Sequence, residues 1–274
     1  MLKRTITAIV GVAVLLPILW LSDTYVFPIA VSIVAVIALY EMYECIGCKS
    51  KYAMTIPAYL ACAAFPILSR FSGMENVLPI VGAFFILYLL YLLLIAVLAH
   101  AEYTMQDISI CYVMTVYITG GFLSIELLRE MSDRVYFLVF IGAWITDIFA
   151  YFVGRLFGKH KLCETISPKK TVEGSIGGVV FCVIFFVLFS LAMPQKDNPW
   201  LYLIMACVGI LVSAVSQIGD LSMSLIKRHY GIKDFGKIFP GHGGVMDRFD
   251  SILAVSLMLF LSFVTLKAFN FLVL

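Results

Sequence analysis

The chain has 274 residues, of which 62% are hydrophobic and only 13% are charged. So few polar side chains cannot cover the surface of a water-soluble globule, and the composition therefore indicates a protein that folds in lipid. Nineteen basic and seventeen acidic residues leave a net charge of +2, which excludes the strongly basic surface expected of a nucleic-acid-binding protein.

Nine apolar stretches follow one another along the chain. They have 15 to 23 residues, and about 20 residues at 1.5 Å rise suffice for a helix to cross a hydrocarbon core of roughly 30 Å. The sequence therefore predicts an all-α fold, a polytopic transmembrane helical bundle of about nine spans. No internal repeat or linker divides the chain, so we expect residues 1–274 to form a single domain. The predicted spans are residues 5–21, 25–40, 54–68, 77–99, 108–127, 135–157, 176–193, 200–219 and 252–274.

The first predicted span follows Lys3 and Arg4, and no small-residue cleavage pattern comes after it. We therefore expect a retained helix and not a signal peptide. Basic residues also predict orientation, because they are held on the cytoplasmic side during insertion. With the N-terminus in the cytoplasm, fourteen of the nineteen basic residues fall on the cytoplasmic side and five fall outside. The two longest polar connections, residues 158–175 and 220–251, then face the cytoplasm.

An acid lies within the sixth predicted span. Asp147, Tyr151, Gly154 and Arg155 are spaced by three and four residues, so they share one face of a helix. An ionisable group inside a span is costly and often marks a functional site. A hydrogen bond from Asp147 to a neighbouring helix is an equally good explanation at this point.

The connection that follows this span carries hydroxyl groups, paired lysines and glycines just before a helix start. It includes Ser167, Lys169, Lys170, Thr171 and Glu173. Such residues at the positive end of a helix dipole favour a bound phosphate. The same residues are also common helix caps, and lysines near a membrane surface also meet anionic lipid headgroups.

The richest polar segment is residues 219–250, here called the signature segment. If the eighth helix continues beyond the membrane, Asp220, Ser224 and Lys227 line one of its faces. Asp247 and Asp250 then share a face at the start of the ninth helix. These acids lie on the same side of the membrane, and the connecting loop is long enough for them to converge.

Convergent carboxylates beside lysines suit Mg²⁺, which takes one or two carboxylates and completes its coordination with phosphate oxygens and water. Glycines around His242 would let backbone amides approach an anion closely. The alternative is a surface loop of solvated ion pairs. That alternative accounts for the charges, but it does not account for the glycines, Pro240, and the acids at both helix ends.

The signature segment resembles the phosphatidate cytidylyltransferases, also called CDP-diacylglycerol synthases, and the resemblance extends over essentially the whole chain. The family pattern has a serine, two residues and Lys-Arg, then Lys-Asp after four more residues, a small residue, a proline, His-Gly-Gly, and a closing Asp-Arg-apolar-Asp. The family also carries an intramembrane Asp followed by Ala-Tyr and Gly, here at Asp147, and a Ser-Pro-Lys-Lys-Thr run with Glu-Gly, here from Ser167. The signature pattern is met by Ser224, Lys227, Arg228, Lys233, Asp234, Gly236, Pro240, His242, Gly243, Gly244, Asp247, Arg248 and Asp250.

This resemblance implies transfer of a cytidylyl group from CTP to phosphatidic acid in a bacterial-type inner or plasma membrane, with the N-terminus and the active site in the cytoplasm. The resemblance supports the hypothesis that Asp220 and Asp247 hold Mg²⁺ and act in catalysis with Lys227 and Asp250, with Asp147 and Asp250 as further ligand candidates. The substrate-binding residues that it implies are Asp147, Tyr151, Lys169, Lys170, Thr171, Glu173, Ser224, Arg228, Lys233, His242, Gly243, Gly244 and Arg248.

Several questions stay open on the sequence alone. They include whether the chain forms a homodimer and whether a monovalent cation joins Mg²⁺. Two other functions also stay open. A CTP-dependent polyprenol or dolichol kinase would move the terminal phosphoryl group to a lipid, and a membrane anion transporter would use Asp147 and the basic loops to pass an anion.

Overall fold

A computed structural model of the chain describes residues 11, 13–193, 198–239, 241, 243–269 and 271. Within these residues, eight helices are long and apolar enough to cross a membrane. They confirm the predicted all-α bundle of an integral membrane protein, and the eight later predicted spans each correspond to one of them. Part of the first predicted span, residues 5–21, lies outside the described residues; its residues 13–20 are helical. The helices are α2 (Val26–Cys45), α3 (Tyr52–Ser72), α4 (Met74–Leu98), α5 (Met105–Met131), α6 (Phe137–Phe157), α7 (Val172–Ser190), α8 (Pro199–His229) and α9 (Met246–Ala268).

Contacts within the chain divide it into two compact units. Unit 1 comprises Met1–Glu130 and Tyr230–Arg248, and unit 2 comprises Met131–His229 and Phe249–Leu274. Unit 1 therefore contains helices α2 to α5 together with the connection between α8 and α9. Unit 2 contains α6 to α8 and most of α9. The expectation of a single domain stays a prediction.

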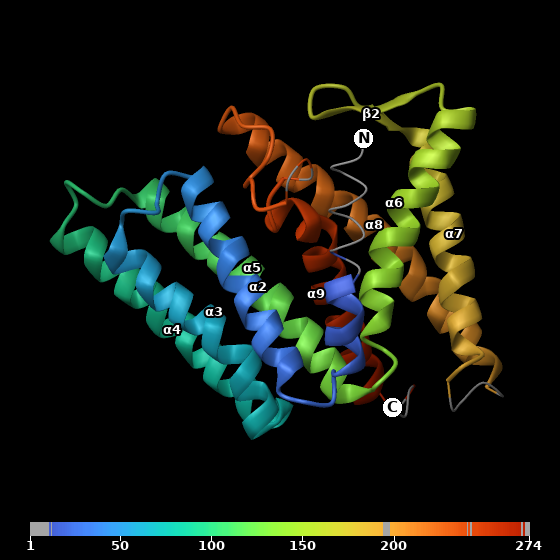
Figure 1. The fold of residues 1–274 in the computed structure, drawn as a ribbon, viewed down its shortest axis with the longest axis horizontal. Helices are drawn as coiled ribbons and strands as arrows, with labels where there is room; N and C mark the ends of the chain where they lie inside the picture. The colour runs from blue at the N-terminus through green and yellow to red at the C-terminus, as the bar shows by residue number, and fades with distance from the viewer. Residues whose placement is uncertain are drawn as a thin grey trace. The chain divides into compact units, whose positions relative to one another are not determined.

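In unit 1, helices α2 to α5 run side by side, as Figure 1 shows. The hydroxyl groups of Tyr43 on α2 and Thr115 on α5 share a buried hydrogen bond of 2.5 Å. At the C-terminal ends of α3 and α5, Arg70 Nε donates to Glu126 Oε1 at 2.8 Å, and Ser69 donates to Glu130 at 3.1 Å. Polar contacts at two levels thus hold apolar helices together where lipid provides no hydrophobic force between them.

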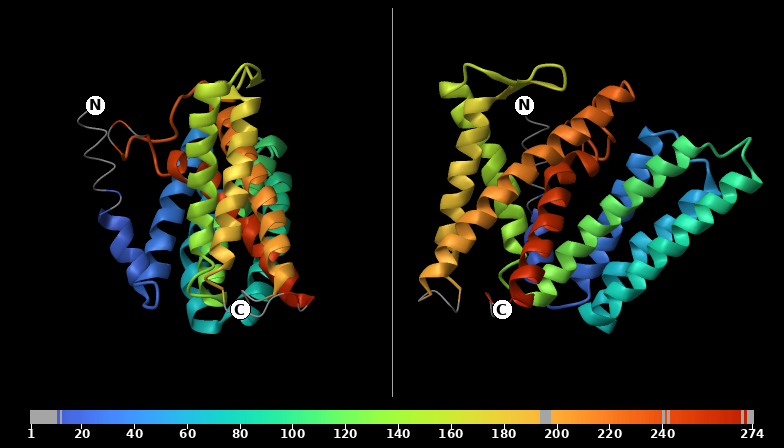
Figure 2. Two further views of the ribbon diagram at one scale, coloured as in Figure 1. Left: turned by 90° about the vertical axis from the view of Figure 1, so that its right-hand side faces the viewer. Right: turned by 180° about the vertical axis from the view of Figure 1, so that it is seen from behind.

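In unit 2, helices α6 and α7 approach closely because glycines line their contact. A Cβ added to Gly177 would lie 2.6 Å from Val153, and one added to Gly178 would lie 2.9 Å from the Thr146 carbonyl oxygen. Figure 2 shows these two helices as a pair joined by a hairpin. The hairpin consists of two short antiparallel strands, β1 (Lys161–Cys163) and β2 (Ser167–Thr171), in a segment that the sequence predicted only as a loop.

Helix α8 packs against α6 and α7 through buried polar groups. The Thr146 hydroxyl on α6 donates to Ser213 Oγ on α8 at 3.1 Å, and Gln217 Nε2 donates to the Ser175 carbonyl oxygen on α7 at 3.3 Å. Each buried polar group that finds a partner avoids a desolvation cost, so these contacts fix how α8 lies on its neighbours. On α8, Ser213 lies about two turns and Gln217 about one turn before Asp220, the first acid of the signature segment.

Candidate active site

Three acids of unit 2, Asp147 on α6, Asp220 on α8 and Asp250 on α9, interact with one another electrostatically, and we call them the acidic cluster. Lys170 on β2 forms an ion pair with Asp220. Lys227 acts on Asp250 through its charge. The structure therefore brings together five of the predicted site residues from four different elements.

The continuation of α8 to His229 explains how its polar residues reach this cluster. Asp220, Ser224 and Lys227 lie at positions i, i+4 and i+7 of one continuous helix, which confirms the shared face expected from the sequence. Gly219 lets α8 approach α9 at this level, because a Cβ there would lie 2.7 Å from the Ala254 side chain.

Two polar side chains of this segment, Thr171 and Glu173, have partners within the protein. Thr171 caps α7 by accepting a hydrogen bond from the Gly174 amide at 3.2 Å. The Glu173 carboxylate accepts the Lys159 amide at 3.0 Å and contacts His160 Nδ1 at 2.6 Å. The helix-cap interpretation of this segment is therefore observed, and its contacts with a substrate stay a prediction.

Asp247 lies in unit 1, where the residue is 7% exposed. Its Oδ2 accepts the Phe235 amide at 2.7 Å and the Gly244 amide at 2.9 Å. Gly243 has a backbone φ of 88°, a conformation that favours glycine. The Gly244 amide, one of those near His242 that the sequence suggests for a bound anion, is thus directed at a carboxylate of the protein itself.

One buried acid of unit 1 was not identified from the sequence. Glu41 on α2 is 2% exposed and accepts the Met246 amide at 2.8 Å. The predicted span ends at Tyr40, so Glu41 falls outside it and the sequence assigns it no role. An acid directly after an apolar stretch was the available signal, since the helix in fact continues to Cys45.

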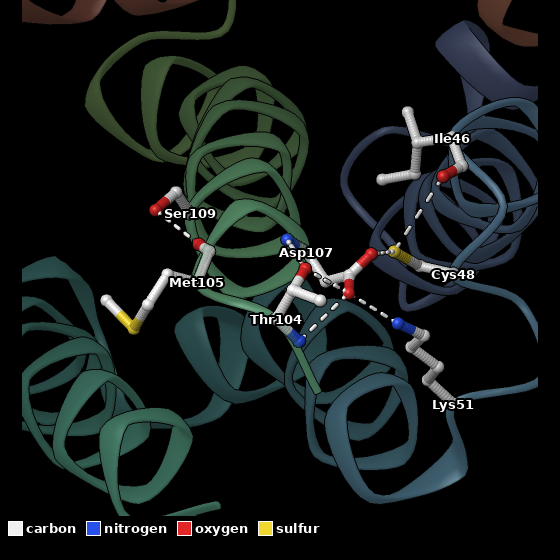
Figure 3. A network of polar contacts seen from close by, with 7 residues as sticks. All are labelled: Ile46, Cys48, Lys51, Thr104, Met105, Asp107 and Ser109. Carbon is white, nitrogen blue, oxygen red and sulfur yellow. Dashed lines mark hydrogen bonds and ion pairs between the residues drawn. The ribbon is translucent and has the colours of Figure 1, made fainter. Parts of the chain in front are cut away.

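A second polar network in unit 1 lies where the α2–α3 connection meets the start of α5. Figure 3 shows Lys51 and Cys48 pointing toward the Asp107 carboxylate. The distance between Lys51 Nζ and Asp107 Oδ2 is 2.5 Å. Thr104 and Asp107 exchange backbone and side-chain hydrogen bonds as a capping box for α5. Burial opposes the charge of Lys51, but the hydrogen bond and the charge of Asp107 outweigh it, and the pKa of Lys51 is raised. The ion pair is therefore retained at neutral pH.

Tyr230, the first residue after α8, lies close to this network. Burial, followed by the neighbouring Cys45 and Cys48, raises the pKa of Tyr230. The connection between α8 and α9, residues 230–245 and here called the signature loop, thus begins near Cys45 at the end of α2 and contacts Glu41 near its own end.

The remaining predicted site residues are less enclosed. The Tyr151 hydroxyl accepts a hydrogen bond from Arg155 at 3.2 Å, which confirms their shared helix face. His242 and Pro240 lie outside the described residues. Four predicted substrate-binding residues are exposed, and their contacts with substrates stay predictions: Lys169, Arg228, Lys233 and Arg248.

The acids that are described do not form a closed metal cage. In the part of the chain that the structure describes, no three His, Cys, Asp or Glu side chains are grouped as a metal site would require. Hard carboxylate oxygens nevertheless fit Mg²⁺, which needs only one or two of them when phosphate oxygens complete its coordination. The acidic cluster is compatible with a cation that binds together with phosphorylated substrates.

Comparison with known proteins gives a consistent result. Residues 2–266 match the model of a family described as the cytidylyltransferase family. The chain is 36% identical over 255 residues to a phosphatidate cytidylyltransferase of Staphylococcus haemolyticus, and the alignment covers 92% of this chain and 95% of that protein. It is 34% identical over 254 residues to the protein of the same name in Staphylococcus aureus, with the same shares of both chains covered.

Proposed function

Because this chain belongs to the cytidylyltransferase family, we propose that it transfers the cytidylyl group of CTP to phosphatidate, giving CDP-diacylglycerol and pyrophosphate. The observation that carries this proposal is the similarity to proteins named phosphatidate cytidylyltransferase over nine-tenths of the chain. The acidic cluster and its two lysines supply charged groups suited to the reaction.

In this reaction, a phosphate oxygen of phosphatidate attacks the α-phosphorus of CTP. A new bond forms between that oxygen and the phosphorus, and the bond to the departing pyrophosphate breaks. A phosphate monoester has a second pKa near 6 and is mostly dianionic at pH 7, so the nucleophile is already deprotonated. The protein therefore needs cations and precise positioning more than it needs a general base.

The lysines of unit 2 are suited to contact the phosphate groups. Lys170 and Lys227 each act on an acid of the acidic cluster and are only partly exposed. Within such a site, their charges offset the repulsion between two anionic substrates. We assign Lys170 and Lys227 to substrate binding and Asp220 to holding both Lys170 and a metal ion.

Mg²⁺ is the cofactor of this proposal. We propose Asp220 and Asp250 as its ligands, because both belong to the acidic cluster together with Asp147. Asp247 as a ligand stays a prediction from the sequence. When bound, Mg²⁺ would neutralise charge that develops on the transferring phosphate and on pyrophosphate. A monovalent cation and a homodimer likewise stay predictions.

We place the N-terminus and the site in the cytoplasm, because fourteen of the nineteen basic residues then lie on that side. Single cysteines introduced at Lys161 and at Ser132 would test this orientation in sealed right-side-out vesicles of a cysteine-free chain. An impermeant maleimide should label position 132 and should label position 161 only after the vesicles are opened. The reverse pattern would invert the proposed topology.

The activity itself is tested with purified chain, Mg²⁺, phosphatidate and CTP labelled at either the α- or the γ-phosphorus. We expect α-label in the lipid product and γ-label in pyrophosphate. Transfer of the γ-label to lipid would indicate a CTP-dependent lipid kinase. Uptake of an anion into proteoliposomes without release of pyrophosphate would indicate a transporter, and either result would refute the proposal.

A further inference from the structure

Glu41 is a buried carboxylate on α2 that contacts the end of the signature loop from far away in the sequence. It is 2% exposed, and its Oε2 accepts the Met246 amide at 2.8 Å across a separation of 205 residues. The Val245 amide also donates to this carboxylate. A charge buried to this degree needs such donors, because its desolvation would otherwise be costly.

Two glycines of the signature segment make room for Glu41. A Cβ added to Gly244 would overlap both carboxylate oxygens of Glu41, and a Cβ added to Gly236 would overlap Oε1. The sequence suggests an anion site for the glycines around His242, which include Gly244, and gives no reason for Gly236. The structure supplies the reason, because the backbone of the loop lies directly against the acid.

Glu41 and Asp247 together bind four amides of the same short stretch. Glu41 accepts from Val245 and Met246, and Asp247 accepts from Phe235 and Gly244. Both ends of the segment 235–246 are thereby fixed to carboxylates. Hydrogen bonds from amides to a buried carboxylate are stronger than neutral ones, so each contributes to holding the backbone at these two ends.

We propose that Glu41 is a positioning residue for catalysis, which holds the signature loop and Asp247 in the arrangement that the reaction requires. This inference rests on the proposed function. Glu41 acts through the backbone of the loop and does not itself touch the substrates. Its removal leaves the Val245 and Met246 amides without their acceptor, and a loosened site loses rate even when its reacting residues are intact.

The kinetic test compares Glu41→Gln and Glu41→Ala with the parent chain. Loss of a charged acceptor should lower kcat by roughly tenfold to a hundredfold, more for Ala than for Gln, with a smaller change in KM for CTP. Glu44→Gln is the matched control, because Glu44 lies one turn further along α2 with an exposed side chain paired to Lys49. A parental kcat in both Glu41 variants would overturn the inference.

Hydrogen exchange provides a readout that needs neither metal nor substrate. In the purified chain without Mg²⁺, we expect Glu41→Gln to speed exchange in peptides covering residues 235–236 and 244–246 by at least about tenfold. The start of α7, which has its own Thr171 cap, should exchange at the parental rate in the same sample. Unchanged protection of the loop, or equal loss of protection in α7, would overturn the inference.

A double-mutant cycle tests the contact itself. Gly244→Ala forces a methyl group onto the Glu41 carboxylate, whereas Glu41→Ala empties that space. We therefore expect Gly244→Ala to reduce activity less in the Glu41→Ala background than in the parent. Additive effects would show that the two positions do not act together. If the parent chain makes no CDP-diacylglycerol, the proposed function fails, while hydrogen exchange still decides whether Glu41 holds the loop.

Discussion

Replacement of Lys170 by Met is the sharpest test of the acidic cluster. Lys170 forms an ion pair with Asp220, and the side chains are 23% and 26% exposed. With their ordinary charges, the three acids and the two lysines Lys170 and Lys227 carry −3 and +2, a net charge of −1. The substitution makes this net charge −2. It should therefore weaken the binding of anionic substrates and favour a bound cation.

The expected size of the effect follows from the interaction of two charges. Unit charges about 4 Å apart interact by about 4 kcal/mol at an effective dielectric constant of about 20. Partial exposure of both side chains lets water and salt screen this interaction, which leaves about 1.5 to 3 kcal/mol. If Lys170 makes a similar contact with a substrate phosphate, kcat/KM should fall roughly tenfold to a hundredfold. The Mg²⁺ concentration for half-maximal activity should stay the same or fall.

The assay measures lipid labelled from CTP in detergent micelles at fixed phosphatidate, with CTP and Mg²⁺ varied separately. Lys161→Met is the control, because Lys161 is an exposed lysine of the same hairpin that donates to the Pro168 carbonyl oxygen at 2.7 Å. It should retain the parental kcat/KM. A Lys170→Met variant within threefold of the parent, or one that needs more Mg²⁺, would refute the reasoning.

Three further outcomes are expected. Glu126→Gln should lower the free energy of unfolding by about 3 kcal/mol, because it leaves the largely buried Arg70 without its counter-charge. Thermal unfolding in detergent measures this effect, and the control Glu75→Gln, at an exposed position, should leave the unfolding temperature unchanged. Thr171→Val should cost about 1 kcal/mol by removing the cap of α7, whereas Thr171→Ser retains it; equal unfolding temperatures would contradict the cap. Removal of divalent ions with EDTA should abolish lipid labelling. Added Mg²⁺ should restore the labelling, whereas added K⁺ alone should not. Activity that survives EDTA would refute the metal requirement.

The membrane spans could be predicted because lipid exposure imposes a long apolar stretch on each of them. Their ends could not be predicted as well, because a helix continues by its backbone hydrogen bonds after its surroundings change. Helix α2 extends past Tyr40 to Cys45 with no polar spacing to indicate it. The extension of α8 past Gly219 to His229 agrees with the spacing of Asp220, Ser224 and Lys227. The β1–β2 hairpin was missed for a related reason, since its short polar strands have no apolar alternation that would distinguish them from a loop.

The identities of the candidate site residues could be predicted, whereas many of their partners could not. Asp220, Ser224 and Lys227 were placed on one face because helix spacing is a local property. The pairing of Glu41 with Met246 joins residues 205 positions apart, and no spacing rule relates them. The same limit applies to the glycines of the signature segment, which suggested an anion site. Gly236 and Gly244 lie instead against an acid of the protein.

The two acids at the start of α9 illustrate what the spacing of the signature segment means physically. Asp247 and Asp250 are one helical turn apart, yet their partners differ. Asp247 accepts amides of the signature loop, while Asp250 interacts through its charge with Asp220 and Lys227. Because the hydrogen bonds of α9 fix the rise between these residues, holding Asp247 also restricts where Asp250 can lie. The paired acids therefore need not be two equivalent metal ligands. Asp247 can hold the loop while Asp250 interacts with the charges of the acidic cluster. Their spacing of three residues keeps both on the same side of the helix.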